Sequence, residues 1–190
     1  MLPAARLHRW QVRACLGLLC ILVLLFAGLF ATRAVFPLAY REEILRYSAA
    51  YNLDPAWVAS IIRCESRFQP EALSPVGAVG LMQIMPETGG WIAEQLQWTD
   101  YSAAVLVNAE QNISLGTWYL RYLLDRFRTR DHALMAYNAG PSNAVAWQGD
   151  LSRAFPETRT YVRRVQTAFP IYRIYFAAPW LFDLIPSLGP

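Results

Sequence analysis

The sequence contains no lysine, only two histidines and only three cysteines. His132 is the sole histidine after residue 8, and no Gly-x-Ser-x-Gly pattern accompanies it, which argues against Ser-His-Asp and Cys-His hydrolase sites. Cys15 and Cys20 fall in an apolar N-terminal run, so Cys64 is the one cysteine in the rest of the chain. These counts predict no intramolecular disulfide, no metal site and no cofactor.

Positive charge is scarce outside the N-terminus, because all seventeen basic residues are arginine and four of them precede residue 37. The rest of the chain has 13 arginines against 14 acidic residues, a formal net charge of −1. No basic stripe with interleaved aromatic residues follows, so nucleic acid is not an expected partner. Apolar residues make up 55% of the 190 residues, which predicts one folded domain with its own core.

The longest apolar run, residues 14–31, is uncharged and as a helix would measure about 27 Å, just enough to cross a hydrocarbon core. The basic stretch 1–13 precedes it, which predicts a cytoplasmic N-terminus and an extracytoplasmic domain. A cleavable signal peptide is the alternative, although Arg33 interrupts the small-residue cleavage pattern. We therefore expect a single-pass signal-anchor in the cell membrane, followed by a linker over residues 32–39.

Helical signals fill residues 40–170, whereas no alternating strand pattern of useful length occurs. The pattern predicts helices over residues 40–51, 55–66, 86–95, 108–127, 131–138, 142–149 and from Pro156 to Phe169. Asp131 and Ser142 are the expected N-caps of the fifth and sixth of these helices. The fold class is therefore predicted to be mainly α. Residues 171–190 form an apolar tail, expected either to strap across the domain or to contact the membrane surface.

Glu65 is unusual because it shares an apolar stripe with Trp57, Ile61 and Phe68 on the predicted second helix. A carboxyl group on such a face is neutral, paired or functional, unless it curls out to solvent at the rim of the stripe. Glycoside hydrolysis usually requires a second carboxyl group, but no other acidic residue is fixed to Glu65 by spacing. The residues alone thus indicate either a single general acid with a raised pKa and no evident partner, or a carboxyl group without a function.

Four segments resemble, in order, the motifs of the SLT-type lytic transglycosylases. They are ESRF at 65–68, SPVGAVGLMQIMP at 74–86, AYNAG at 136–140 and ETRTYV at 157–162. The resemblance covers roughly residues 40 to 169 and implies a lysozyme-like α fold. It also implies a bacterial enzyme that acts on the glycan strands of peptidoglycan, the polymer of the cell wall.

By this resemblance Glu65 is the catalytic acid, which protonates the oxygen of the β-1,4 bond between N-acetylmuramic acid and N-acetylglucosamine. Its carboxylate would then take the proton of the muramoyl C6 hydroxyl, which closes on C1 to give a 1,6-anhydro end. The substrate's own N-acetyl group would assist at C1, so no second carboxyl group of the protein is required. Burial should raise the pKa of Glu65 so that it holds a proton near neutral pH.

The resemblance assigns seven further residues to substrate binding: Ser66, Gln83, Met85, Tyr137, Asn138, Glu157 and Tyr161. Ser66 would touch the N-acetyl region, although a serine at a helix end also bonds its own backbone. Tyr137 would lie near Glu65 and orient it or a sugar hydroxyl. Pairing of Glu157 with Arg159 or Arg163 is the competing structural account for that residue.

Two other functions remain open from the sequence. A muramidase of the same fold would use the same acid and admit water. A catalytically weak glycan-binding scaffold would instead place partners in a cell-wall synthesis or envelope assembly.

Overall fold

The computed structural model describes residues 4–180, with side chains from Trp10 onward, and the regular secondary structure of this part of the chain is helical apart from isolated bridges. The two β-bridges pair Leu73 with Val79 and Val79 with Ile84, and both lie in one loop. The predicted mainly α fold class is confirmed.

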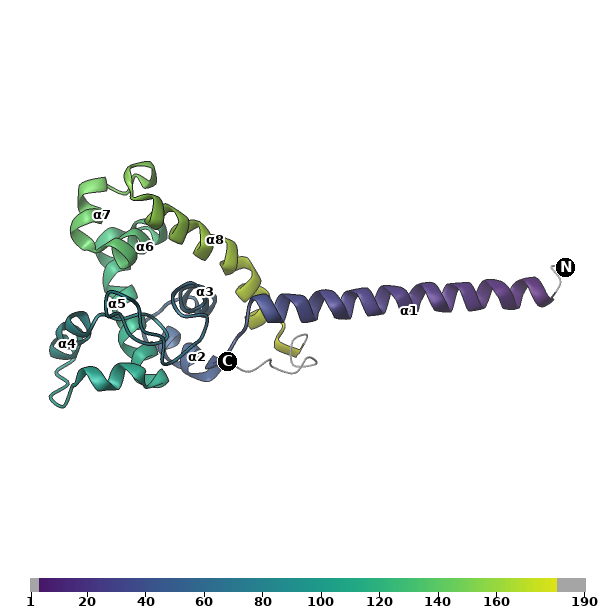
Figure 1. The fold of residues 1–190 in the computed structure, drawn as a ribbon, viewed down its shortest axis with the longest axis horizontal. Helices are drawn as coiled ribbons and strands as arrows, with labels where there is room; N and C mark the ends of the chain where they lie inside the picture. Colours follow the sequence, from purple (N-terminus) through teal and green to yellow (C-terminus); the bar gives the residue numbers. More distant parts are fainter. Residues whose placement is uncertain (1–3, 181–190) are drawn as a thin grey trace.

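Helix α1 (Ala4–Val35) projects away from the domain as a single long rod (Figure 1). Its segment Trp10–Val35 has a mean hydropathy of 2.8 and is long and apolar enough to cross a membrane. The side chains of its most apolar stretch are not buried against the domain. A signal sequence near an N-terminus has the same length and composition, so the helix indicates an envelope-associated or secreted protein.

The first residues of the stretch predicted as a linker, 32–39, continue helix α1, and the following ones contact the domain. Helix α1 continues through Val35, and the backbone carbonyl of Val35 accepts a hydrogen bond from Nε of Arg63 at 2.8 Å. The Phe36 ring meets the Tyr172 ring edge-on at 6.3 Å, and the Tyr172 hydroxyl donates to the Pro37 carbonyl at 2.7 Å. These contacts dock the start of the domain onto its last helix.

The domain contains seven further α-helices and two 3-10 helices among the described residues. They are α2 (Arg41–Ala50), α3 (Pro55–Glu65), α4 (Pro86–Gln95), η1 (Ala103–Val107), α5 (Ala109–Phe127), α6 (Arg130–Ala139), α7 (Pro141–Trp147), η2 (Leu151–Arg153) and α8 (Pro156–Ala177). Every predicted α-helix is present, and α4 has the predicted bounds. The two 3-10 helices lack a periodic sequence signal and were not predicted.

Two expected N-caps are wrong. Thr129, not Asp131, caps α6, because its side chain accepts from the backbone N–H of His132. Asp131 lies in the first turn, where a negative charge favours the helix dipole instead. Helix α7 begins at Pro141 after Gly140, so Ser142 lies inside the helix rather than at its cap.

The core forms around α3, whose residues from Ala56 to Ile62 are all buried. Helix α3 packs against α8 on one side and α2 on another, while α5 contacts α2, α4 and α6. Because α3 is enclosed in this way, its last residue, Glu65, lies in a cleft beside α8.

Helix α8 continues through Pro170 to Ala177, past the boundary drawn at residue 170. Tyr172 and Tyr175 are 0% and 1% exposed, so this stretch belongs to the core rather than to a separate tail. Residues 181–190, the rest of the predicted apolar tail, lie outside the described residues.

Candidate active site

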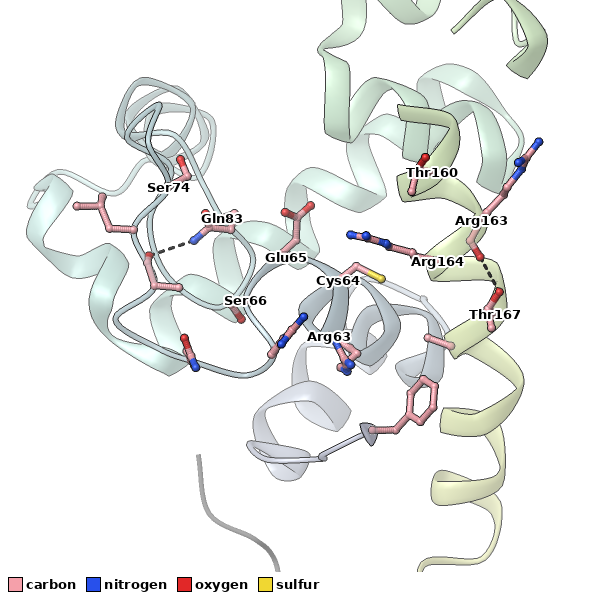
Figure 2. A pocket seen from close by; sticks show the side chains of 16 residues that line it. Arg63, Cys64, Glu65, Ser66, Ser74, Gln83, Thr160, Arg163, Arg164 and Thr167 are labelled. Atoms are coloured by element: carbon pink, nitrogen blue, oxygen red, sulfur yellow. Dashed lines mark hydrogen bonds between the residues drawn. The ribbon is translucent and has the colours of Figure 1, made fainter. Parts of the chain in front are cut away.

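Glu65 is the last residue of α3 and projects into the space between the loop of Ser74 and Gln83 and helix α8 (Figure 2). The helix is fixed at its start by Asp54, whose side chain accepts from the N–H of Ala56 at 2.9 Å. It ends where Arg67 and Phe68 adopt positive φ angles of 54° and 66°, which turn the chain back toward the core.

The environment of Glu65 favours its protonated form. Burial raises the pKa of its carboxyl group from 4.5 to about 7. The nearby Tyr161 hydroxyl acts in the opposite direction and lowers this pKa, although no hydrogen bond of good geometry joins Tyr161 to any described residue. Desolvation is the larger effect, so the carboxyl group holds its proton up to neutral pH.

Two cavities meet at Glu65. The larger has a volume of about 900 Å³ and the smaller about 410 Å³, and both are lined by Cys64, Glu65, Thr160 and Arg164. The cleft therefore passes on both sides of the carboxyl group. An extended polymer could therefore bind along the cleft with an internal bond placed at the carboxyl group.

The loop before α4 forms one wall of the larger cavity, and Asn112 of α5 holds this loop in place. The Asn112 side chain is fully buried and accepts from the N–H of Met82 at 2.7 Å. Its amide nitrogen donates to the carbonyls of Val79 at 2.9 Å and Leu106 at 2.8 Å. At Gly80, which has a φ of 81°, a Cβ atom would lie 2.3 Å from the Leu106 carbonyl oxygen. None of the sequence motifs points to Asn112 as part of the site.

Ser66 and Gln83 line the larger cavity, but their hydrogen bonds go largely to the backbone. The Ser66 hydroxyl lies 2.8 Å from the Leu81 carbonyl, to which it donates. Gln83 donates from Nε2 to the carbonyls of Ala72 and Gly80, each at 3.0 Å. Among the described residues its amide oxygen has no donor, so this oxygen is the group that Gln83 offers to a ligand.

Asn138, Glu157 and Tyr161 line the smaller cavity. Glu157 lies in the first turn of α8, and no described arginine forms an ion pair with it. Arg159 instead donates to the carbonyls of Ser152 at 3.1 Å and Ala154 at 3.0 Å. The carboxylate of Glu157 therefore stays available to a ligand.

Tyr137 and Met85 line neither of these two cavities. The Tyr137 hydroxyl donates to the Met82 carbonyl at 2.8 Å, so this side chain supports the loop from behind. Tyr137 is nevertheless close enough to Glu65 for the carboxylate charge to raise the pKa of the phenol, after burial as the larger cause. Met85 precedes the first turn of α4 as its N-cap residue.

Comparison with known proteins identifies the domain. Residues 42–155 match the family profile described as the transglycosylase SLT domain, which is more than half of the chain. The chain belongs to the transglycosylase SLT family. This result confirms the family predicted from the four motifs, all but the last of which lie inside the matched range.

Individual proteins that are similar to this SLT-family chain are also named as transglycosylases. The soluble lytic murein transglycosylase of Escherichia coli K12 is 38% identical over 154 residues, which cover 74% of this chain and 24% of that protein. The transglycosylase of Enterobacteria phage PRD1 is 40% identical over 119 residues, covering 63% of this chain and 41% of the phage protein. The chain therefore spans about a quarter of the length of the E. coli relative and less than half of the phage protein.

Solved structures show the same fold. An inactive Glu-to-Gln variant of lytic transglycosylase Slt from Pseudomonas aeruginosa is 34% identical, with a TM-score of 0.71, and covers 75% of this chain and 25% of that one. A complex of the 70-kDa soluble lytic transglycosylase with bulgecin A gives a TM-score of 0.72 at 34% identity, over 76% of this chain and 26% of that one.

No group of three or more His, Cys, Asp or Glu side chains within the described part of the chain is placed to hold a metal ion.

Proposed function

We propose that this chain is a lytic transglycosylase that cleaves peptidoglycan between N-acetylmuramic acid and N-acetylglucosamine and leaves 1,6-anhydromuramoyl ends. The observation that carries the proposal is a single carboxyl group, Glu65, with a pKa of about 7 in a cleft that continues on both sides of it. A carboxyl group with such a pKa is suited to act as an acid first and as a base afterwards. The SLT relatives support the same activity.

In the first step Glu65 donates its proton to the glycosidic oxygen, and the bond from that oxygen to the muramoyl C1 breaks. The N-acetylglucosamine side leaves with a free hydroxyl group, and the substrate's N-acetyl group stabilises the charge at C1. In the second step the Glu65 carboxylate takes the proton of the C6 hydroxyl, whose oxygen then bonds to C1. The proton returns to Glu65, so the enzyme is regenerated without water.

We assign the binding roles by cavity. Ser66 and Gln83 would contact the strand on the loop side, while Asn138, Glu157 and Tyr161 would contact it beside α8. Tyr137 and Met85 would act through the loop and the start of α4 instead of touching the sugar at the bond that is cleaved. The proposed location is the cell membrane, with α1 as a single span, a cytoplasmic N-terminus and the domain outside.

Product analysis tests the proposed reaction. The full chain, purified in detergent micelles, is incubated with purified peptidoglycan, and the soluble products are identified by mass spectrometry. We expect muropeptides with anhydro ends, each lighter by one water than the hydrolysis product. Reducing ends in their place would identify a muramidase, and binding of peptidoglycan without either product would identify a scaffold.

The pH dependence of the reaction follows from the raised pKa of Glu65. The acid form is the reactive form of the free enzyme, so kcat/KM is expected to fall as the pH rises above about 7. Because the Tyr161 hydroxyl lowers this pKa, the Tyr161→Phe variant should keep activity to higher pH than the wild type. Initial rates of anhydro-end formation between pH 5 and pH 9 measure both effects. Tyr51→Phe, outside both cavities, serves as the control, and an identical alkaline limb in Tyr161→Phe would contradict the assignment.

A further inference from the structure

Four arginines line the larger cavity beside Glu65: Arg63, Arg67, Arg163 and Arg164. They come from two directions, the end of α3 and the middle of α8 (Figure 2). Glu65 is the only acidic residue in this lining. In a domain whose charges nearly balance, this wall of the cleft is therefore strongly positive.

These arginines are not used by ion pairs of the protein. The ion pairs of the described residues join Arg46 to Glu110, Arg121 to Asp125 and Arg130 to Asp54, all outside this cavity. Arg63 donates to the Val35 carbonyl, and its Cζ atom lies 5.7 Å from the centroid of the Phe36 ring. Figure 2 shows Arg164 extending from α8 toward Glu65, whereas Arg163 points toward the outer rim.

A neutral sugar ring does not need such a wall. Hydroxyl and acetamide groups are bound by polar uncharged side chains and backbone groups, whereas guanidinium groups match carboxylates and other planar anions. In peptidoglycan the charged groups closest to the glycan are the carboxylates of the peptide stems. Each stem is attached through the lactyl group on C3 of a muramoyl residue.

We propose that this arginine wall binds the carboxylates of the peptide stem on the muramoyl residue at or next to the bond that is cleaved. The inference rests on the proposed function, because that function places a muramoyl C1 at Glu65 and therefore a stem within the same cleft. It makes the preferred substrate the peptide-bearing, anionic strand. Naked or neutralised glycan binds more weakly.

The expected change in affinity follows from the solvent exposure of the arginine side chains. Arg67 and Arg164 are exposed, so each pair with a carboxylate is expected to change affinity only about three- to fivefold, and high salt should reduce the effect. Two arginines together therefore give about tenfold.

The experiment compares two forms of one ligand. Soluble glycan strands with intact stems are labelled at one end, and half of the sample is treated with carbodiimide and ammonia, which converts the carboxylates to amides and leaves the stems in place. Binding to the full-length Glu65→Gln protein in detergent is measured by fluorescence anisotropy. We expect amidation to weaken binding about tenfold.

Variants locate the effect. Arg67→Gln/Arg164→Gln, made in the Glu65→Gln background, should weaken binding of the native strand about tenfold and of the amidated strand less than twofold. The control, Arg153→Gln/Arg173→Gln, removes the same number of charges outside both cavities and should leave both affinities unchanged. Thermal unfolding verifies that each variant is folded.

Equal affinity for native and amidated strands would overturn the inference, as would an equal loss on both strands in the Arg67/Arg164 variant. The proposed function is judged separately, by anhydro ends formed with Glu65 intact. Anhydro ends together with charge-independent binding would leave the function standing and remove the arginine wall. Charge-dependent binding without anhydro ends would support binding of carboxylates by the arginine wall and contradict the proposed function.

Discussion

Replacement of Glu65 by glutamine is expected to reduce the formation of 1,6-anhydromuramoyl ends about 10²- to 10⁴-fold. Glutamine has nearly the same shape but neither donates an acidic proton to the glycosidic oxygen nor removes one from the C6 hydroxyl. Both proton transfers of the proposed reaction are therefore lost at once. The initial rate of anhydro products from purified peptidoglycan, separated by chromatography and identified by mass spectrometry, measures the loss.

The same substitution should stabilise the protein at neutral and alkaline pH. The folded-state pKa of Glu65 is raised from 4.5 to about 7, so above pH 4.5 the unfolded state loses its proton first and the wild type loses stability until about pH 7. The glutamine variant has no proton to lose at this position, so it does not show this loss of stability. Its advantage in the free energy of unfolding should be near zero below pH 4.5 and level off above pH 7, at about 3 kcal/mol.

A variant at an exposed glutamate separates these effects from general charge removal. Glu94→Gln, on α4, should change neither the rate of anhydro-end formation nor the pH dependence of stability. If Glu65→Gln lyses peptidoglycan at the wild-type rate, the proposed mechanism is wrong. If it is inactive but no more stable than the wild type at pH 8, Glu65 is catalytic without being held protonated by burial.

The sequence was most informative where local signals and burial agree. Asp54 and Pro55 mark the start of α3, and its apolar stripe places Glu65 at the edge of the core, so both the helix and its unusual acid could be predicted. The position of α4 followed from Pro86 for the same reason. These features depend on neighbours within a few turns of the chain.

The features that could not be predicted depend on contacts between distant segments. Arg63 and Arg164 lie on different helices, so their shared cavity becomes visible only when α3 and α8 are packed together. The extension of α8 beyond Pro170 has a similar origin, because burial of Tyr172 and Tyr175 stabilises a helix that a proline would otherwise weaken. The docked junction after α1 depends on Tyr172 in the same way.

Asn112 is the clearest case of such a residue, and its replacement by alanine is expected to have the largest effect on stability. The change would leave two buried backbone groups without partners, the N–H of Met82 and the carbonyl of Leu106, whereas the carbonyl of Val79 would keep its hydrogen bond from the N–H of Ile84. Each unsatisfied buried group costs about 1–3 kcal/mol, so we expect a loss of about 3–5 kcal/mol in the free energy of unfolding. Urea titration of the full chain in detergent, followed by tryptophan fluorescence, measures this loss.

The Asn112→Ala variant should also lose activity under conditions in which it is still folded. The N–H of Met82 and the carbonyl of Val79, which lose their hydrogen bonds to Asn112, belong to the loop carrying Gln83, and Gln83 is itself held by the Gly80 carbonyl of that loop. A shift of this wall by about 1 Å can cost up to about 10²-fold in rate, because the strand is no longer held against Glu65.

Asn108→Ala provides the matched control, since Asn108 caps the same helix from an exposed position by accepting from the N–H of Gln111. Its loss should cost only about 1 kcal/mol and leave the rate unchanged, because the cap does not touch the loop. Equal effects of the two variants would mean that Asn112 stabilises α5 alone. A large loss of activity specific to Asn112→Ala would instead show that the buried amide holds the cleft wall in place, even though it lies behind the wall and contacts no substrate.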